Sequence, residues 1–202
     1  MRKILGLAGT HGTGKSTILQ GVKASGFDVS EAQLSRAAQA ALGWDTLKRV
    51  EESEENMWAL QEAILTALIE RDSRIVELTL VERTPADLWA YTVAWCERLG
   101  INPQTHWRAK LYKERVKSAC SSYDIFVIVR SHESIPFVEE PNRADLNSRE
   151  VVAKTIDDFT WDMMIPTFNI YTVSKADRIN EAVSIMKSRA SEHDRRKSIS
   201  GI

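Results

Sequence analysis

Residues 9–16 read Gly-Thr-His-Gly-Thr-Gly-Lys-Ser, which is a complete Walker A pattern, G-x-x-x-x-G-K-[ST]. The apolar residues 3–8 before it are typical of a short strand, and residues 15–23 after it are typical of a helix. Glycine lets the backbone wrap closely around a phosphate group, because a Cβ atom would clash there. The N–H groups of such a loop and of the following helix N-terminus bind anionic oxygens. The sequence therefore predicts a phosphate-binding loop between a strand and a helix.

Nine consecutive residues form this predicted nucleotide-binding segment. They are Gly9, Thr10, His11, Gly12, Thr13, Gly14, Lys15, Ser16 and Thr17. We expect the Lys15 ammonium to reach the β- and γ-phosphates of a nucleoside triphosphate, and the Ser16 hydroxyl to bind Mg²⁺. His11 is expected to contribute through its backbone more than through its imidazole. The segment thus predicts ATP and Mg²⁺ as ligands.

Composition limits the classes of protein that fit. The chain has 202 residues, enough for one domain with a core, and its net charge of −1 gives no general attraction for nucleic acid. Cys96 and Cys120 show neither metal-ligand spacing nor a disulfide pattern, which favours a reduced, cytoplasmic environment. No apolar run approaches the roughly 18 residues that a membrane span needs. We therefore expect a cytoplasmic protein without a membrane partner, and leave open whether it forms a homodimer.

Strand-like and helix-like segments alternate along the chain. The sequence predicts strands at residues 3–8, 26–31, 75–81, 125–129 and 167–173, and helices at 15–23, 32–42, 57–72, 85–99, 106–121, 148–163 and 177–189. This alternation predicts an α/β fold with a parallel sheet of about five strands and helices on both faces, and together with the Walker A pattern it predicts a P-loop NTPase three-layer sandwich. We expect one domain over residues 1–190, with a lid loop at 131–147, and a polar, basic, frayed tail at 191–202. Ligands should gather at the carboxyl ends of the strands.

Candidate catalytic side chains follow two of these strands. Glu82, after the third strand, can hold a metal ion or its waters, and Arg83 beside it can neutralise phosphate charge. Asp87 fits a site role or a favourable place in the first turn of a helix, and both interpretations stay open. Glu31, after the second strand, can accept the proton of an acceptor hydroxyl, and Arg36 can bind an acceptor phosphate. A solvated carboxylate and a surface arginine are the alternatives for this last pair.

Arginines bracket the long segment after the fourth strand. Arg130, Arg143 and Arg149 could close over transferring phosphate charge, as lid arginines do. A loop of this length within a compact domain is usually functional, although a solvated loop with incidental arginines remains an alternative. Residues 107–117 are basic with two aromatic side chains, and could face nucleic acid. We favour instead a solvated helix face with Trp107 and Leu111 packed inward.

With these residues in place, the chain resembles small P-loop kinases of the nucleoside and nucleotide kinase type. It resembles thymidylate-kinase-like and nicotinamide-riboside-kinase-like proteins, many of them from phages. The resemblance covers residues 1–190 and is carried by GTHGTGKS at 9–16, Glu31, VERTPADLWAY at 81–91, IPFVEEPNRADLNSRE at 135–150 and VSKADR at 173–178. The Glu-Arg-Thr phrase resembles the Glu-Arg-Ser signature of deoxynucleoside kinases, and residues 173–178 resemble a loop that such kinases place beside adenine. A plain acceptor signature is missing.

The resemblance implies ATP-dependent transfer of the γ-phosphate to a nucleoside, a nucleotide or a related acceptor. On this interpretation Lys15, Glu31, Glu82, Arg83, Arg143 and Arg149 are catalytic, and Ser16 and Glu82 bind the metal. One alternative is a phage DNA kinase that phosphorylates 5-hydroxymethyluracil in DNA, which would work in the host cytoplasm and have a modified base in DNA as its partner. Another alternative is a regulatory P-loop ATPase without a small-molecule acceptor.

Overall fold

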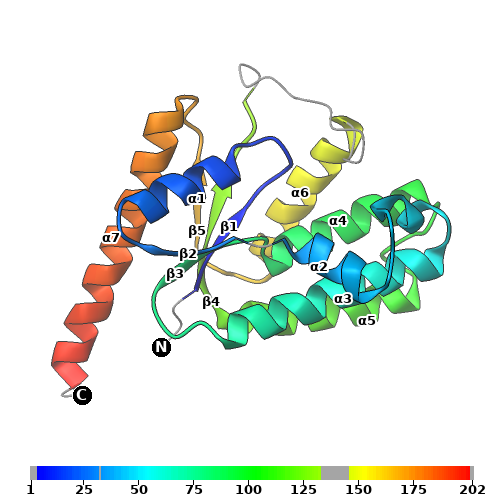
Figure 1. The fold of residues 1–202 in the computed structure, drawn as a ribbon, viewed down its shortest axis with the longest axis horizontal. Coiled ribbons are helices and arrows are strands. Elements are labelled where there is room, and N and C mark those ends of the chain that lie inside the picture. Colours follow the sequence, from blue (N-terminus) through cyan, green and yellow to red (C-terminus); the bar gives the residue numbers. More distant parts are fainter. Residues whose placement is uncertain (1–3, 32, 133–145, 201–202) are drawn as a thin grey trace.

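The computed structural model describes residues 4–31, 33–132 and 146–200, which form a parallel sheet covered by helices (Figure 1). The strands are β1 (Ile4–Ala8), β2 (Asp28–Ser30), β3 (Thr79–Glu82), β4 (Tyr123–Val129) and β5 (Thr167–Ile170). Their order across the sheet is β2-β3-β1-β4-β5, and each neighbouring pair is parallel. The predicted α/β fold with a parallel sheet of five strands is confirmed.

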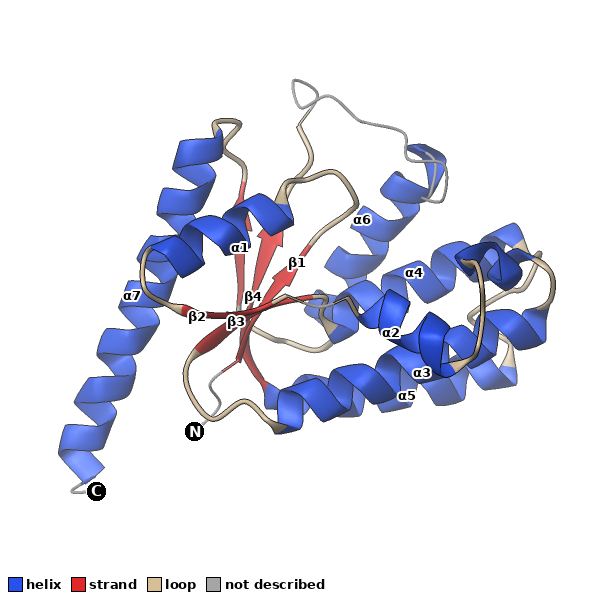
Figure 2. Ribbon diagram, viewed as in Figure 1, coloured by secondary structure: helices blue, strands red, loops and turns tan. Residues whose placement is uncertain are grey.

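Helices cover both faces of the sheet, which gives three layers (Figure 2). On one face lie α1 (Lys15–Ala24) and α7 (Lys175–Ser200). They pack on Leu5, Leu7 and the other apolar side chains on that face of the sheet. On the other face lie α2 (Leu34–Ala41), α3 (Glu54–Ser73), α4 (Pro85–Arg98), α5 (Trp107–Ala119) and α6 (Leu146–Asp162). The whole of β1 is buried, as expected for a parallel strand covered on both sides.

Local sequence signals explain where several helices begin. The Ser53 hydroxyl accepts a hydrogen bond from the backbone N–H of Asn56 at the start of α3. Thr84 and Asp87 form a capping box before α4, and Pro85 occupies the first helical position, where its missing N–H leaves no bond unmade. The described connections include the short 3₁₀ helices η1 (Leu47–Glu51) and η2 (Cys120–Ser122). Within the described ranges, no helix has the length and apolar character needed to cross a membrane.

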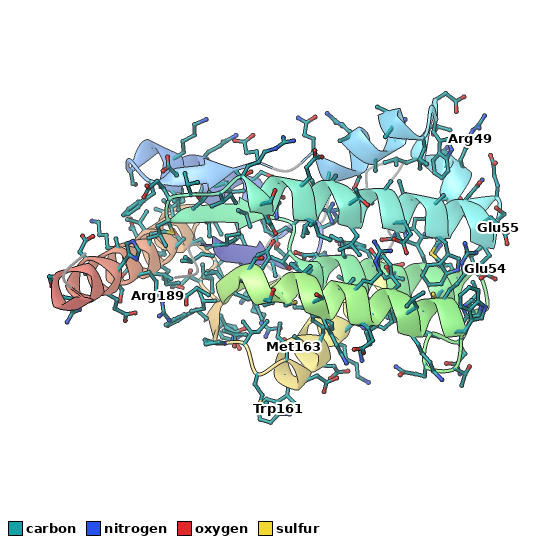
Figure 3. The ribbon with its side chains drawn as sticks, turned by 90° about the horizontal axis from the view of Figure 1, so that it is seen from below. Arg49, Glu54, Glu55, Trp161, Met163 and Arg189 are labelled. Carbon is teal, nitrogen blue, oxygen red and sulfur yellow. The ribbon has the colours of Figure 1, made fainter. Side chains whose placement is uncertain are left out.

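The C-terminal segment differs from the prediction. We expected the last helix to end at residue 189 and a frayed tail to follow, but α7 continues to Ser200. The sequence between residues 177 and 200 contains neither glycine nor proline, so nothing in it stops a helix. Arg189 also pairs with Glu192 at 2.9 Å, which supports the helix past the expected end. Figure 3 shows α7 projecting beyond the sheet, with Arg189 labelled on it.

Other boundaries shift by a few residues. The strand expected at 75–81 begins only at Thr79, and the one expected at 167–173 ends at Ile170. Helix α6 begins at Leu146, inside the segment expected to be the lid loop, whose residues 133–145 lie outside the described ranges.

Candidate functional site

The glycine-rich segment is a tight turn between β1 and α1. Gly9, Gly12 and Gly14 have positive φ angles of 144°, 74° and 83°, and residues with a Cβ atom rarely adopt such backbone angles. A Cβ atom on Gly9 would lie 2.6 Å from the carbonyl oxygen of Val129. Gly14 is the N-cap of α1, so the first backbone N–H groups of that helix face the turn. The backbone therefore forms the concave, donor-lined loop that a phosphate group fits.

Lys15 lies across this turn and is only 6% exposed. Its ammonium group donates hydrogen bonds to the carbonyl oxygens of Gly9 at 2.7 Å and Thr10 at 2.8 Å. The Thr13 hydroxyl donates to the same Thr10 carbonyl at 2.9 Å. Ser16, one position further along α1, is exposed. The turn thus holds a buried cation, and the exposed Ser16 hydroxyl follows it on α1.

The ends of β1, β2 and β3 bring the predicted carboxylates to the same edge. Leu7, two residues before the turn, pairs with Glu82 in the sheet register. Ser30 pairs with Val81, so Glu31 and Glu82 each follow the paired positions of neighbouring strands. Glu82 is half-buried and Glu31 is exposed. This is the carboxyl edge of a parallel sheet, next to the point where the strand order reverses, where ligands of such folds bind.

Arg83 has an unusual backbone and a crowded side chain. Its φ of 65° lies in the left-handed region, although it is not a glycine. Its guanidinium carbon lies 4.9 Å from the centre of the Tyr91 ring, and that ring lies 4.9 Å from the His11 ring. Burial opposes the charged form of Arg83, but the nearby Tyr91, Asp87 and Glu82 outweigh it, and the pKa of Arg83 is raised. Burial also raises the pKa of Tyr91 to about 12, so its phenol stays protonated near neutral pH. The His11 side chain therefore joins the site, which the sequence did not indicate.

Asp87 connects the phosphate loop to α4. It is fully buried, and one carboxylate oxygen accepts a hydrogen bond from the Gly9 backbone N–H at 3.0 Å. Its other oxygen accepts bonds from the N–H and the hydroxyl of Thr84, each at 2.8 Å. Of the two interpretations left open for Asp87, the geometry favours the structural one. Asp87 belongs to the capping box of α4, and it also holds the Gly9 backbone at the start of the phosphate loop.

Arg178 was missing from the predicted site, although the phrase at 173–178 contains it. It lies in the first turn of α7 and is only 4% exposed. Its guanidinium donates to the carbonyl oxygens of Thr13 in the phosphate loop, of Thr172 after β5, and of Arg130 after β4, the last at 3.0 Å. Burial lowers the pKa of this guanidinium, and Glu181 partly offsets the effect. Arg178 therefore ties three strand ends together beneath the phosphate loop.

The remaining predicted arginines have different surroundings. Arg130 donates two hydrogen bonds to Asp157 on α6, at 2.8 and 2.6 Å, and one to Asn169 on β5 at 2.7 Å. The bonds to Asp157 raise the pKa of Arg130. They also hold the Arg130 guanidinium against α6. Arg149 is half-buried near the start of α6, Arg36 is exposed on α2, and Arg143 lies outside the described residues.

Helix α5 corrects one prediction. Trp107 and Leu111, expected to pack inward, are 67% and 57% exposed, and the buried positions are Ala109, Tyr112 and Val116. These three recur at i, i+3 and i+7, the spacing of a single helix face. Among the basic residues of α5, three have carboxylate partners: Lys113 with Asp162, Arg115 with Glu62, and Lys117 with Glu114.

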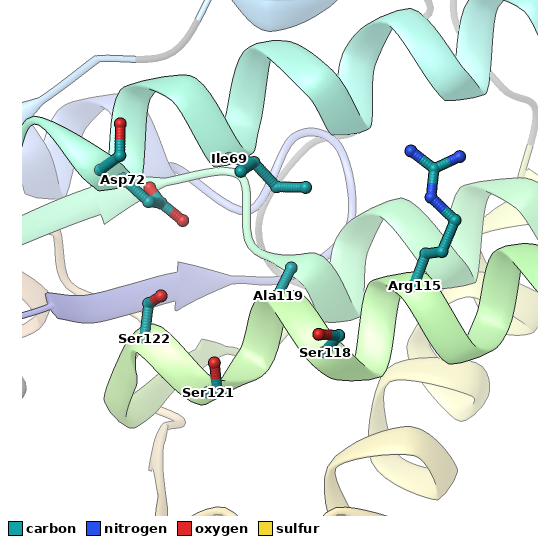
Figure 4. Close-up of a pocket in the computed structure, with 8 residues that line it drawn as sticks. Ile69, Asp72, Arg115, Ser118, Ala119, Ser121 and Ser122 are labelled. Atoms are coloured by element: carbon teal, nitrogen blue, oxygen red, sulfur yellow. The ribbon is translucent and has the colours of Figure 1, made fainter.

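A separate cavity of about 320 Å³ lies between the end of α3 and the end of α5 (Figure 4). Its lining residues are Ile69, Asp72, Ser73, Arg115, Ser118, Ala119, Ser121 and Ser122. These residues belong neither to the phosphate loop nor to the carboxyl ends of β1, β2 and β3. We therefore assign this cavity no part in the candidate site.

Five parallel strands in the order β2-β3-β1-β4-β5, with the glycine-rich turn between β1 and α1, define the fold of this chain. Solved structures share it: a deoxyadenosine kinase from M. mycoides with dCMP and dCDP products has a TM-score of 0.64, with 14% identity over 92% of this chain and 99% of that one. The same kinase with bound dCTP has a TM-score of 0.63, with 15% identity over 94% and 99% of the two chains. A shikimate kinase from Acinetobacter baumannii in complex with shikimate has a TM-score of 0.55, with 14% identity over 95% of each chain. No family model matches the chain, nor does any curated protein.

Proposed function

We propose that this chain is an ATP-dependent kinase that transfers the γ-phosphate to a hydroxyl group of a nucleoside, a nucleotide or a related small molecule. The observation that carries the proposal is the pairing of Leu7 with Glu82, which sets a carboxylate and Arg83 beside the phosphate loop. Catalysis of phosphoryl transfer is mostly positioning and charge stabilisation, and this edge offers groups for both. The likeness in fold to proteins named deoxyadenosine kinase and shikimate kinase supports the same class of reaction.

The phosphate loop would bind the triphosphate of ATP. Backbone N–H groups at the start of α1 would donate to phosphate oxygens, and Lys15 would exchange its two carbonyl contacts for the β- and γ-phosphates. Arg83 would neutralise charge on the transferring group. We also propose that Arg143 and Arg149 act as lid arginines, the role expected from the sequence.

The donor set at this edge fits Mg²⁺. Ser16 and Glu82 offer hard oxygen donors, and Mg²⁺ usually takes only one or two protein ligands beside substrate phosphates and water. Among the described residues, no group of three or more His, Cys, Asp or Glu side chains could hold a metal ion by itself. When bound, Mg²⁺ would neutralise part of the phosphate charge.

Glu31 would act as the general base. Its carboxylate is exposed at the end of β2, next to the register position of Glu82, where an acceptor could approach. It would take the proton of the acceptor hydroxyl while that oxygen bonds to the γ-phosphorus and the bond to the β-phosphate oxygen breaks, releasing ADP.

The test is a transfer assay with ATP labelled at the γ-phosphate. Its acceptors are deoxynucleosides, nucleoside monophosphates, small hydroxy acids and duplex DNA that contains 5-hydroxymethyluracil. Label on a small acceptor supports the proposal. Label on DNA alone would favour the DNA kinase instead. The structure gives that alternative little support, because three basic residues of α5 that could bind a phosphate backbone pair with carboxylates of this chain. Release of inorganic phosphate without any labelled acceptor would favour the regulatory ATPase.

A further inference from the structure

Arg71, on the last turn of α3, reaches the backbone of the candidate site. Its side chain is only 12% exposed. One terminal nitrogen donates to the carbonyl oxygen of Glu82 at 2.6 Å, and the other donates to the carbonyl oxygen of Arg83 at 3.1 Å. These are consecutive carbonyls at the end of β3, so one guanidinium group holds the peptide units on both sides of Arg83.

The Arg71 guanidinium is itself held by two further side chains, those of Asp72 and Tyr123. Its Nε donates to a carboxylate oxygen of Asp72 at 2.8 Å, and the nitrogen that binds the Arg83 carbonyl also donates to the Tyr123 hydroxyl at 2.8 Å. Burial raises the pKa of Asp72, although Arg71 opposes this shift, and burial holds the pKa of Tyr123 well above its usual range. The hydroxyl of Tyr123 therefore stays neutral and remains an acceptor for Arg71. A planar guanidinium group whose N–H groups are bound by several acceptors has one orientation.

The turn after β3 needs such support. Arg83 is in the left-handed region, which is unfavourable for a residue with a Cβ atom and persists only where the surroundings hold it. Rotation about the φ and ψ bonds of Arg83 would turn its side chain relative to that of Glu82. The two Arg71 bonds oppose that rotation, and thereby fix where these two side chains point.

We propose that Arg71 is a positioning residue, which fixes the Glu82–Arg83 turn so that its carboxylate and guanidinium face the phosphate loop. The proposal rests on the proposed function, because it assigns Arg71 to the support of that reaction. Arg71 would touch neither ATP nor the acceptor. Its effect would pass through two backbone carbonyls that any residue could supply, so the pattern of side chains in the sequence does not indicate Arg71.

The test compares the variants Arg71→Lys and Arg74→Lys. Lysine keeps the positive charge beside Asp72 but cannot span two carbonyls and the Tyr123 hydroxyl with one rigid group. Arg74 is the matched control, since it is the C-cap residue that directly follows α3, and its side chain is exposed and pairs with Glu70 at 2.8 Å. We expect R71K to lower kcat by about 10- to 100-fold, the size of effect that a small misplacement of reacting groups produces, with KM for ATP little changed. R74K should match the unsubstituted protein.

A second readout separates positioning from simple stability. The Mg²⁺ concentration at half-maximal ATP binding should rise in R71K if the Glu82 carboxylate has turned away, and should stay unchanged in R74K. A folded R71K with unchanged kcat and unchanged Mg²⁺ dependence would overturn the proposal, whatever its melting temperature. Should R71K not fold, Tyr123→Phe removes one anchor of the guanidinium, and we expect a smaller shift in the same direction; no shift would overturn it equally. If the unsubstituted protein labels no acceptor, the proposed function fails, while the Mg²⁺ titration still decides the role of Arg71.

Discussion

Replacing Asp87 with asparagine tests the link between the phosphate loop and α4. The substitution keeps the size of the side chain and removes its charge. Three donors point at the two carboxylate oxygens of Asp87: the N–H groups of Gly9 and Thr84 and the Thr84 hydroxyl. Asparagine offers only one oxygen, and its amide nitrogen would face a backbone N–H group that cannot become an acceptor.

The cost follows from that mismatch. The Thr84 hydroxyl can rotate and accept a hydrogen bond, but one backbone N–H must lose its partner in a fully buried place. A hydrogen bond to a charged group contributes about 1.5–3 kcal/mol, and an unpaired buried donor adds to the loss, so we expect D87N to lose about 2–4 kcal/mol of folding stability. In a chain of this size that corresponds to a fall in Tm of about 4–16 °C.

Calorimetry on D87N and on Asp45→Asn gives the comparison. Asp45 is exposed and pairs with Arg49 at 3.3 Å on the surface, so its loss should change stability by less than about 1 kcal/mol. D87N should also bind ATP more weakly, because the Gly9 N–H no longer fixes the entry to the loop. A Tm of D87N as high as that of D45N would refute the reasoning, since it would mean that the bonds to Gly9 and Thr84 contribute nothing net.

Three further substitutions test the proposed roles. Lys15→Ala should abolish phosphate transfer and leave the fold intact, and circular dichroism with an activity assay checks both; normal turnover in the folded variant would contradict the phosphate-loop assignment. Glu82→Gln should lower turnover and raise the Mg²⁺ requirement, because a neutral amide holds a hard cation less well, and a Mg²⁺ titration measures it; an unchanged titration would make Glu82 structural. Glu31→Gln should reduce kcat by about 10²- to 10⁴-fold while ATP affinity is kept, as expected on loss of a general base; a collapse of ATP affinity with normal turnover per bound ATP would contradict that role.

The sequence was sufficient for the features that local chemistry determines. The continuous apolar run of β4 predicted a parallel strand, and the pattern at residues 9–16 predicted a turn that the left-handed Gly12 and Gly14 now form. The extension of α7 could also have been predicted, because residues 177–200 contain neither glycine nor proline. The wrong orientation of Trp107 and Leu111 came from assuming that large apolar side chains define the buried face, whereas Tyr112 defines it.

The residues that the sequence did not reveal act through backbone atoms. Arg71 and Arg178 contact the candidate site through carbonyl oxygens, which every residue has, so these contacts leave no trace in the pattern of side chains. Asp87 stayed ambiguous because Gly9, its partner, is 78 positions away and only the folded sheet brings them together. Non-local contacts of this kind need the three-dimensional structure.

The bond from Arg178 to Thr13 has a consequence for the order of folding. The two residues are 165 positions apart, so the phosphate loop depends on a side chain that is synthesised 165 residues after it. Because domains fold as units during synthesis, an early nascent chain carries the complete motif without the guanidinium that fixes it. Closing so long a loop is slow, since its entropic cost precedes the contacts that reward it. A nascent chain stalled before residue 178 should therefore retain ATP poorly, and acquire the capacity to hold it only when the last helix docks.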